Sequence, residues 1–165
     1  MNREPTRRAL LLFTFVSLLL LACGGPEAST TGIFPDANQS EFGFGEPADA
    51  ANSDRVVEID TTDDLTFIPA DLKVTAGETI TFRIVNEGTI VHDFTLGDQA
   101  TQDEHAEEMA EMEGMAHDQP NTVTVAAGET KELTWTFTRP GAVLIGCHQP
   151  GHYEAGMTGQ VSVEA

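Results

Sequence analysis

The chain has 165 residues, with 8 basic and 27 acidic side chains and a formal net charge of −19. Because single domains commonly span roughly 100 to 200 residues, this length predicts one compact domain with tails. The negative charge argues against nucleic acid as a partner, since binding to phosphates requires Lys and Arg.

The first 22 residues have the pattern of an export signal. Three arginines precede an apolar run at residues 9–21, and small residues with Cys23 follow. The run is too short for a transmembrane helix, which needs about 20 residues. The Leu-Leu-Ala-Cys that ends at Cys23 resembles a bacterial lipobox, in which the cysteine is lipidated and becomes residue one. We therefore expect residues 1–22 to be a lipoprotein signal peptide; an ordinary signal peptide with an incidental cysteine is the alternative.

Removal of the signal peptide leaves 5 basic and 26 acidic side chains, a formal charge of −21. Such a surface repels anionic lipid and attracts a basic protein partner, although a solvated surface without a specific partner is an equal alternative. We expect a monomer, anchored at the periplasmic or extracellular face of a membrane. If Cys23 carries lipid, Cys147 is the one remaining cysteine, which excludes a structural disulfide.

Residues 23–54 are rich in Gly, Pro, Ala, Ser, Asn and acidic residues and show no sustained periodicity. This composition predicts a flexible, lipid-anchored linker. Phe34, Phe42 and Phe44 are unusual in a linker, because aromatic residues are depleted in disordered segments. They could dock on the domain or form an extra strand.

From Arg55 onward, β-branched and aromatic residues alternate with polar ones between turn signals, so we place the folded domain at residues 55–165. Two Ala-Gly-Glu turns, at 76–78 and 127–129, each join two strand-like runs, which fits a Greek-key β-sandwich. The strands are expected at 55–60, 65–68, 71–75, 78–86, 90–96, 121–126, 129–138, 141–147 and 158–164. The residues expected in the core are Ile80, Phe82, Ile84, Leu133, Trp135 and Phe137.

An acidic insert at about 98–119 interrupts the strand pattern, and its middle, residues 101–116, is predicted to be helical. The fold class is therefore all-β, a Greek-key β-sandwich with a helical acidic insert. The insert carries five residues that are capable of binding metal: His105, Met109, Met112, Met115 and His117.

A second group of such residues lies near the C-terminus, where Cys147, His152 and Met157 follow the spacing Cys-x4-His-x4-Met. His92, on a predicted strand far upstream, supplies a second imidazole. Two imidazoles and a thiolate with a weaker thioether form the arrangement that supports one-electron copper chemistry. Each residue alone has an ordinary structural explanation, but together they predict a single type 1 copper site. We prefer His152 to His148 as a ligand, because the neighbour of Cys147 on an extended chain points to the opposite face.

These four residues, at the end of an alternating sandwich, resemble the cupredoxin family, which includes plastocyanin and azurin. The loop spacing is similar to that of rusticyanin and auracyanin. The resemblance covers about residues 55–165 and implies a type 1 copper ion and electron transfer to redox proteins through the exposed edge of His152. One departure concerns Asp93, since many members have Asn after the upstream histidine, and that residue often joins the two ligand segments.

Electron transfer is therefore the leading interpretation, and we expect no enzyme, because no second His-x-His copper cluster is present. Two alternatives stay open. The first is an exported copper-handling or chaperone protein that uses the insert to bind a second copper, although the same residues also fit a stripe that packs against the sandwich. The second is a structural or adhesive sandwich domain with a vestigial site.

Overall fold

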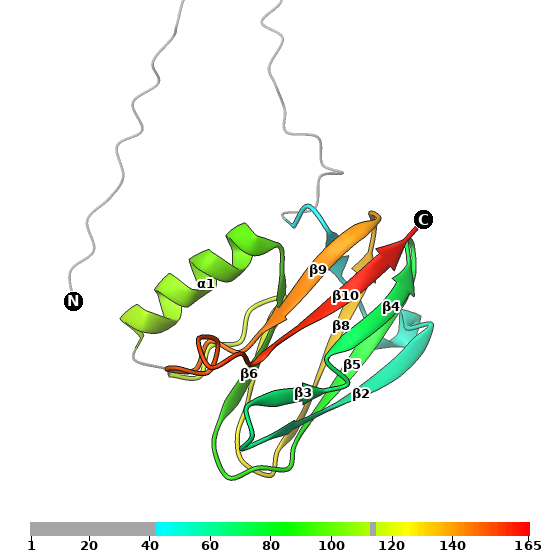
Figure 1. Cartoon of the computed structure of the whole chain (residues 1–165). Coiled ribbons are helices and arrows are strands. Elements are labelled where there is room, and N and C mark those ends of the chain that lie inside the picture. The colour runs from blue at the N-terminus through cyan, green and yellow to red at the C-terminus, as the bar shows by residue number, and fades with distance from the viewer. Residues whose placement is uncertain (1–41, 113–114) are drawn as a thin grey trace, which may run out of the picture. The chain divides into compact units, whose positions relative to one another are not determined.

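The computed structural model describes residues 42–112 and 115–165, which form two five-stranded sheets and one α-helix (Figure 1). The predicted signal peptide, Cys23, Phe34 and most of the predicted linker lie outside the described residues. In chain order the elements are β1 Gly45–Pro47, η1 Ala50–Asn52, β2 Arg55–Thr62, β3 Thr66–Ile68, β4 Asp71–Thr75, β5 Thr79–Asn86, β6 His92–Gly97, α1 Gln99–Glu111, β7 Thr122–Val125, β8 Thr130–Phe137, β9 Gly141–Gly146 and β10 Thr158–Glu164.

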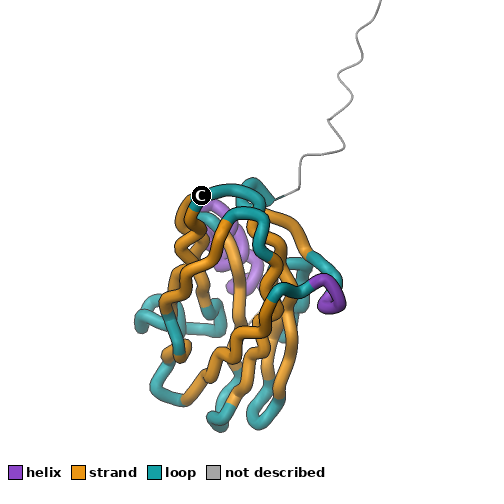
Figure 2. Tube along the Cα trace, turned by 90° about the vertical axis from the view of Figure 1, so that its right-hand side faces the viewer, coloured by secondary structure: helices purple, strands orange, loops and turns teal. Residues whose placement is uncertain are grey.

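The two sheets have the strand orders β1-β8-β5-β2-β3 and β4-β10-β9-β6-β7. The chain crosses from one sheet to the other after β3, β4, β5, β7 and β8, and Figure 2 shows the two layers from the side. The pairs β2 with β5 and β4 with β10 are parallel, and the other pairs are antiparallel. The predicted all-β sandwich with a helical insert is confirmed, and each of the nine predicted strands begins and ends within two residues of its observed bounds.

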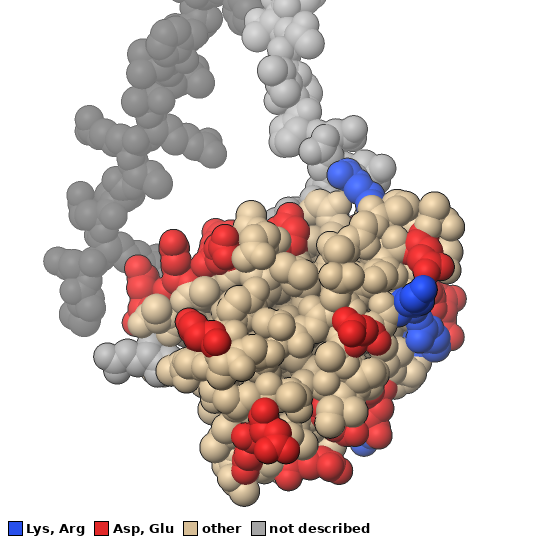
Figure 3. Space-filling model, in the orientation of Figure 1, with Lys and Arg blue, Asp and Glu red and all other residues tan. Residues whose placement is uncertain are grey.

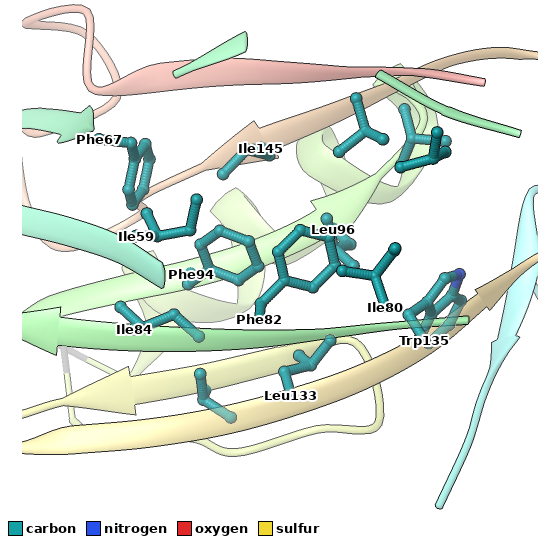
Figure 4. Close-up of a cluster of buried hydrophobic side chains, with 14 of the residues drawn as sticks. Ile59, Phe67, Ile80, Phe82, Ile84, Phe94, Leu96, Leu133, Trp135 and Ile145 are labelled. Carbon is teal, nitrogen blue, oxygen red and sulfur yellow. The ribbon is translucent and has the colours of Figure 1, made fainter. Parts of the chain in front are cut away.

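The core lies between the two sheets, as the alternation of the strands predicts. All six predicted core side chains are buried, and Figure 4 shows the rings of Phe82 and Phe94 facing each other from opposite layers, with centroids 5.2 Å apart. Each fully buried side chain of this size contributes about 1.5–3 kcal/mol relative to an exposed one. This packing fixes the register of the strands, because a slip of one residue would turn every apolar side chain outward.

Strand β1 extends the fold upstream of its predicted boundary. Residues 45–47 pair with β8, and the ring of Phe44 is 7% exposed and stacks on Trp135 at a centroid distance of 5.2 Å. A Cβ atom at Gly45 would collide with the backbone of Thr136 and the indole of Trp135, so only glycine permits this approach. The predicted linker at 23–54 is therefore corrected at its C-terminal end, since residues 42–54 belong to the described fold.

The insert forms a shorter helix than predicted. Asp98 caps its first turn by accepting hydrogen bonds from the backbone and hydroxyl of Thr101, and the helix ends at Glu111. Beyond it, the N–H of His117 donates to the Thr124 hydroxyl, and the N–H of Thr124 donates to the Asp118 carboxylate. These hydrogen bonds attach residues 117 and 118 to β7. Within the described part of the chain, no helix is long and apolar enough to cross a membrane.

Replacement of Phe44 with Ala tests whether β1 belongs to the fold. We expect the free energy of unfolding to fall by about 3 kcal/mol, because a buried aromatic ring is lost and a cavity forms beside Trp135. Urea denaturation followed by Trp135 fluorescence measures this change. The matched control is Ile68→Ala, at a side chain that is 53% exposed and whose loss should cost less than about 0.5 kcal/mol. Equal stability of the Phe44→Ala variant and the parent would place β1 outside the cooperative unit.

Candidate metal centre

Two neighbouring strands bring His92 and Cys147 to the same end of one sheet. His92 is the first residue of β6, and Cys147 follows the last residue of β9. The two strands are antiparallel, with Thr95 opposite Gly146, so the start of one lies beside the end of the other. Residues that are 55 positions apart in the chain therefore become neighbours.

The loop from β9 to β10 adds His152 to this pair. Cys147 Sγ lies 3.3 Å from His152 Nδ1 and 4.0 Å from His92 Nδ1. The three potential ligand atoms all lie within 4.8 Å of one another, and the two imidazole rings are 5.1 Å apart. Cys147 and His92 are fully buried, whereas His152 is half-buried. One thiol and two imidazoles thus converge on a small volume, with His152 nearest to solvent.

Met157 is held beside these residues by the backbone of the loop. The N–H of Cys147 donates to the Met157 carbonyl at 3.2 Å, and the N–H of Met157 donates to the His152 carbonyl at 3.0 Å. The loop turns through Gly151 and Gly156, whose φ angles of 83° and 97° favour glycine. The Met157 side chain is fully buried. All four predicted ligands therefore belong to one compact, hydrogen-bonded unit.

Burial controls the protonation of these groups. It raises the pKa of the Cys147 thiol to about 12, despite the nearby amides of Asp93 and Gln149 that favour the thiolate. It lowers the pKa of both His92 and His152, so the imidazoles are neutral at physiological pH and their lone pairs are available. A cation between the three groups would replace the thiol proton and offset the cost of the buried negative charge, which fits a metal ion bound by soft sulfur and borderline nitrogen ligands.

Asp93 joins the two segments that carry the ligands. Its backbone N–H points at Cys147 Sγ at 3.3 Å, and its carboxylate accepts a hydrogen bond of 2.9 Å from the side chain of Gln149. Both side chains are buried, and burial raises the pKa of the Asp93 carboxyl. The link expected from Asn in similar proteins is therefore made here by Asp93 with Gln149. The sequence contained no signal for Gln149, because a glutamine in a loop has many ordinary roles.

His148 lies away from the three converging groups. Its Nε2 is 2.7 Å from Gln102 Oε1 on α1, and its ring stacks on Tyr153 with centroids 4.6 Å apart. Burial lowers the pKa of His148 to about 4, so the ring is neutral. Gln102 also donates to the Thr95 and Leu144 carbonyls, which attaches the helix to β6 and β9. Sequence analysis missed Gln102, whose role depends on contacts with three separate segments.

The five histidines and methionines of the insert that could bind a metal do not lie together. Met109 is buried and lines a cavity of about 240 Å³ against the loop that carries His148. His105 lines a different cavity, and the ring of His117 lies 6.4 Å from that of His105. Met115 is 62% exposed. The structure thus separates Met109 from the two histidines and gives no common site for the whole set.

Comparison with known proteins identifies the class. Residues 54–164 match the family model described as copper binding proteins, plastocyanin/azurin family. The chain therefore belongs to the plastocyanin/azurin family of copper-binding proteins, the cupredoxins, and copper is its cofactor.

Among individual proteins, the chain is similar to two that are named copper-resistant cuproprotein CopI. It is 42% identical over 127 residues to the protein of Rubrivivax gelatinosus, with 77% of each chain covered. It is 40% identical over 150 residues to that of Pseudomonas aeruginosa, with 73% of this chain and 82% of the relative covered.

Solved structures with the same fold include two auracyanins. Auracyanin B has a TM-score of 0.60 and 24% identity, covering 74% of this chain and 96% of its own. Auracyanin A, a blue copper protein from Chloroflexus aurantiacus, has a TM-score of 0.55 and 27% identity, covering 66% of this chain and 98% of its own.

The raised pKa of Cys147 predicts that its thiol reacts slowly with disulfide reagents in the copper-free protein. In a Cys23→Ser variant, a pKa of about 12 leaves about one thiol in ten thousand ionised at pH 8. We expect reaction with a disulfide reagent to be about 1000-fold slower than in the unfolded chain, and to accelerate about tenfold per pH unit up to pH 10. Stopped-flow absorbance measures the rate, and the Cys23→Ser/Cys147→Ser double variant is the blank. A folded rate within tenfold of the unfolded one would contradict the assigned burial.

Proposed function

We propose that this chain is an exported, lipid-anchored electron carrier that holds one type 1 copper ion between His92, Cys147, His152 and Met157. The observation that carries the proposal is the convergence of one thiol and two imidazoles within 4.8 Å. Cys-x4-His-x4-Met spacing supports Met157 as the fourth, weaker ligand, since its backbone is bonded to both Cys147 and His152. The predicted lipobox at Cys23 supports the anchor.

The chemistry of these four residues supports one-electron transfer. Bound copper supplies the couple between Cu(II) and Cu(I), of which sulfur ligands favour the reduced ion and imidazoles suit the oxidised one. The residues themselves provide a fixed setting: two adjacent strands carry His92 and Cys147, and the loop bonds hold His152 and Met157. Because the group is buried, water has little access to it. A site that cannot rearrange freely favours electron transfer over binding and turnover of a substrate.

His152 is the group through which electrons would enter and leave. It is half-buried, whereas His92, Cys147 and Met157 are fully buried. An electron partner that docks over this end of the sandwich would therefore come closest to copper at the His152 ring. We propose this edge as the contact with redox proteins, and we assign the chain no catalytic reaction of its own.

The surface charge supports a basic partner protein. Figure 3 shows acidic side chains spread over one face, with few basic ones among them. Four of the basic side chains in the described part are already paired with carboxylates, in the pairs Arg55–Glu78, Lys73–Glu164, Arg83–Glu58 and Lys131–Asp118. The remaining acidic groups leave a negative field that would steer a basic partner toward the molecule and disfavour nucleic acid. We propose that the carrier works as a monomer.

Addition of one equivalent of Cu(II) tests the ligand assignment. We expect an intense blue or green thiolate band, because Cys147 supplies a thiolate ligand. Cys147→Ser should abolish the band, while Met157→Gln should keep it and lower the reduction potential, since a soft ligand that favours Cu(I) is lost. Absorbance spectroscopy and a redox titration measure these effects, with Cys23→Ser as the matched cysteine control. A band that persists in the Cys147→Ser variant would refute the assignment.

Copper handling is the second candidate function, and the names of the two CopI relatives favour it. Two groups of residues are candidates for this function, the thiolate site and the insert. If copper tolerance depends on the thiolate site, Cys147→Ser should abolish it. If it depends on copper bound by the insert, changes at His105 or His117 should abolish it instead.

Growth on copper tests which of the two groups of residues copper tolerance depends on. In a host that lacks its own copy, we expect the parent chain to restore growth at copper concentrations that stop the deletion strain. We expect the Cys147→Ser variant to fail and His117→Gln to succeed, because the first removes the thiolate and the second leaves it in place. Growth rate against copper concentration measures this, with immunoblots to compare protein levels. Full rescue by the Cys147→Ser variant would show that copper tolerance does not depend on the thiolate site.

A further inference from the structure

The residues that follow Cys147 and His152 in the chain lie against each other. The rings of His148 and Tyr153 stack with centroids 4.6 Å apart and an angle of 15° between their planes. The Cys147 side chain belongs to the buried core, whereas His148 points toward α1, because adjacent residues of an extended chain face opposite sides. The stack therefore joins, on the outer side of the sheet, the chain neighbours of two of the proposed ligands.

Gln102 on α1 holds the ring of His148 in this position. Its amide nitrogen donates to the carbonyls of Thr95 and Leu144, at 3.0 and 3.3 Å, so its oxygen faces the histidine. The distance from that oxygen to His148 Nε2 is 2.7 Å, and an amide oxygen only accepts, which assigns the hydrogen to Nε2. The ring of His105, also on α1, packs edge-on against the same imidazole at 5.2 Å. The helix therefore fixes the orientation of the His148 ring.

The side chains of Gln102, His148 and Tyr153 meet over Gly146, the last residue of β9. A Cβ atom there would collide with Gln102 Oε1 and would lie 3.0 Å from His148 Nε2 and 2.9 Å from Tyr153 Cε2. Gln102 cannot move aside freely, because its amide group makes three hydrogen bonds. Figure 1 shows α1 beside β9 and β6 on the outside of the sandwich. The helix, β9 and the loop that follows β9 are thus packed together at one point.

We propose that Gln102, His148 and Tyr153 form a clamp, which positions two copper ligands from the outer side of the sheet. Those ligands are Cys147 and His152, each of which directly precedes a residue of the clamp. The three side chains are positioning residues, because they lie outside the group of potential ligand atoms that converge within 4.8 Å. The insert thereby takes part in the copper site without binding the ion. The inference rests on the proposed ligand set, but not on electron transfer.

The clamp adds to two links that already hold the loop between β9 and β10. One is the pair of backbone hydrogen bonds that join Met157 to Cys147 and His152, and the other is the bond between Gln149 and Asp93. Neither of these links involves the helix. A loop that is also held by α1 resists the local opening that would expose the Cys147 thiol or release copper. Loss of the clamp should therefore change the folded site, in addition to any effect on overall stability.

Two pairs of variants test the clamp. Gln102→Leu keeps the size of the side chain but removes its three hydrogen bonds, and Gln99→Leu, at an exposed position on the same helix, is its matched control. Tyr153→Ala removes the stacked ring, whereas Tyr153→Phe keeps the ring and is the conservative control. Ile80→Val, at a core position near the start of β5, controls for a loss of stability alone.

Two properties of the folded site are measured in the full chain with Cys23→Ser. In copper-free protein, we expect Gln102→Leu and Tyr153→Ala to make Cys147 react with a disulfide reagent about tenfold faster than in the parent, because the loop opens more often. Competition with the Cu(I) chelator bicinchoninate should show a dissociation constant that is about tenfold or more weaker in both variants. The three controls should keep the values of the parent.

Thermal melting verifies that each variant is folded. If Gln102→Leu does not fold, the half-buried Tyr153 decides the test, through the comparison of its Ala and Phe variants. A thiol rate and a Cu(I) dissociation constant within about twofold of the parent in Tyr153→Ala would overturn the proposal, as would equal changes in Ile80→Val. A parent without a thiolate band would instead contradict the proposed ligand set. A faster thiol in Tyr153→Ala would still support the clamp in that case, because this measurement needs no copper.

Discussion

The pairing of β6 with β9 is the constraint on which the metal centre depends. The register that sets Thr95 opposite Gly146 places the start of one strand beside the end of the other, and the N–H of Asp93 then reaches Cys147 Sγ. A shift of one residue would turn His92 to the other face of the sheet. The apolar side chains between the sheets oppose such a shift, because it would expose them. The apolar packing that stabilises the sandwich therefore also fixes the positions of the ligands.

The side chain of Gln102 attaches helix α1 of the insert to this arrangement. Gln102 donates to the carbonyls of Thr95 and Leu144 and contacts His148 Nε2 through its oxygen. Helix α1 is thus attached to both strands that carry ligands and to the residue after Cys147.

Local patterns in the sequence predicted most of the fold, and the exceptions have physical causes. Alternation along β5 and β8 identified the core, because a strand with one buried face repeats every two residues. The three residues of β1 are too short for such a pattern, and the strand depends on Phe44 docking against Trp135. Helix α1 ends early because Thr124 on β7 offers partners to the segment that follows. Both deviations come from contacts between distant segments, which a local pattern does not contain.

For the metal centre, the sequence by itself determined the kinds of donor and their spacing on the C-terminal loop, since side-chain chemistry and short turns are local properties. The sequence also predicted His92 and His152 as the histidines beside Cys147, but only the tertiary structure fixed the distances between them and the places of the other three histidines. His92 and His152 lie beside Cys147, whereas His148 contacts Gln102. His105 and His117 both lie near Glu108. The physical reason is that distances between residues far apart in the chain are fixed by strand register and helix docking, which the packing of the whole core determines.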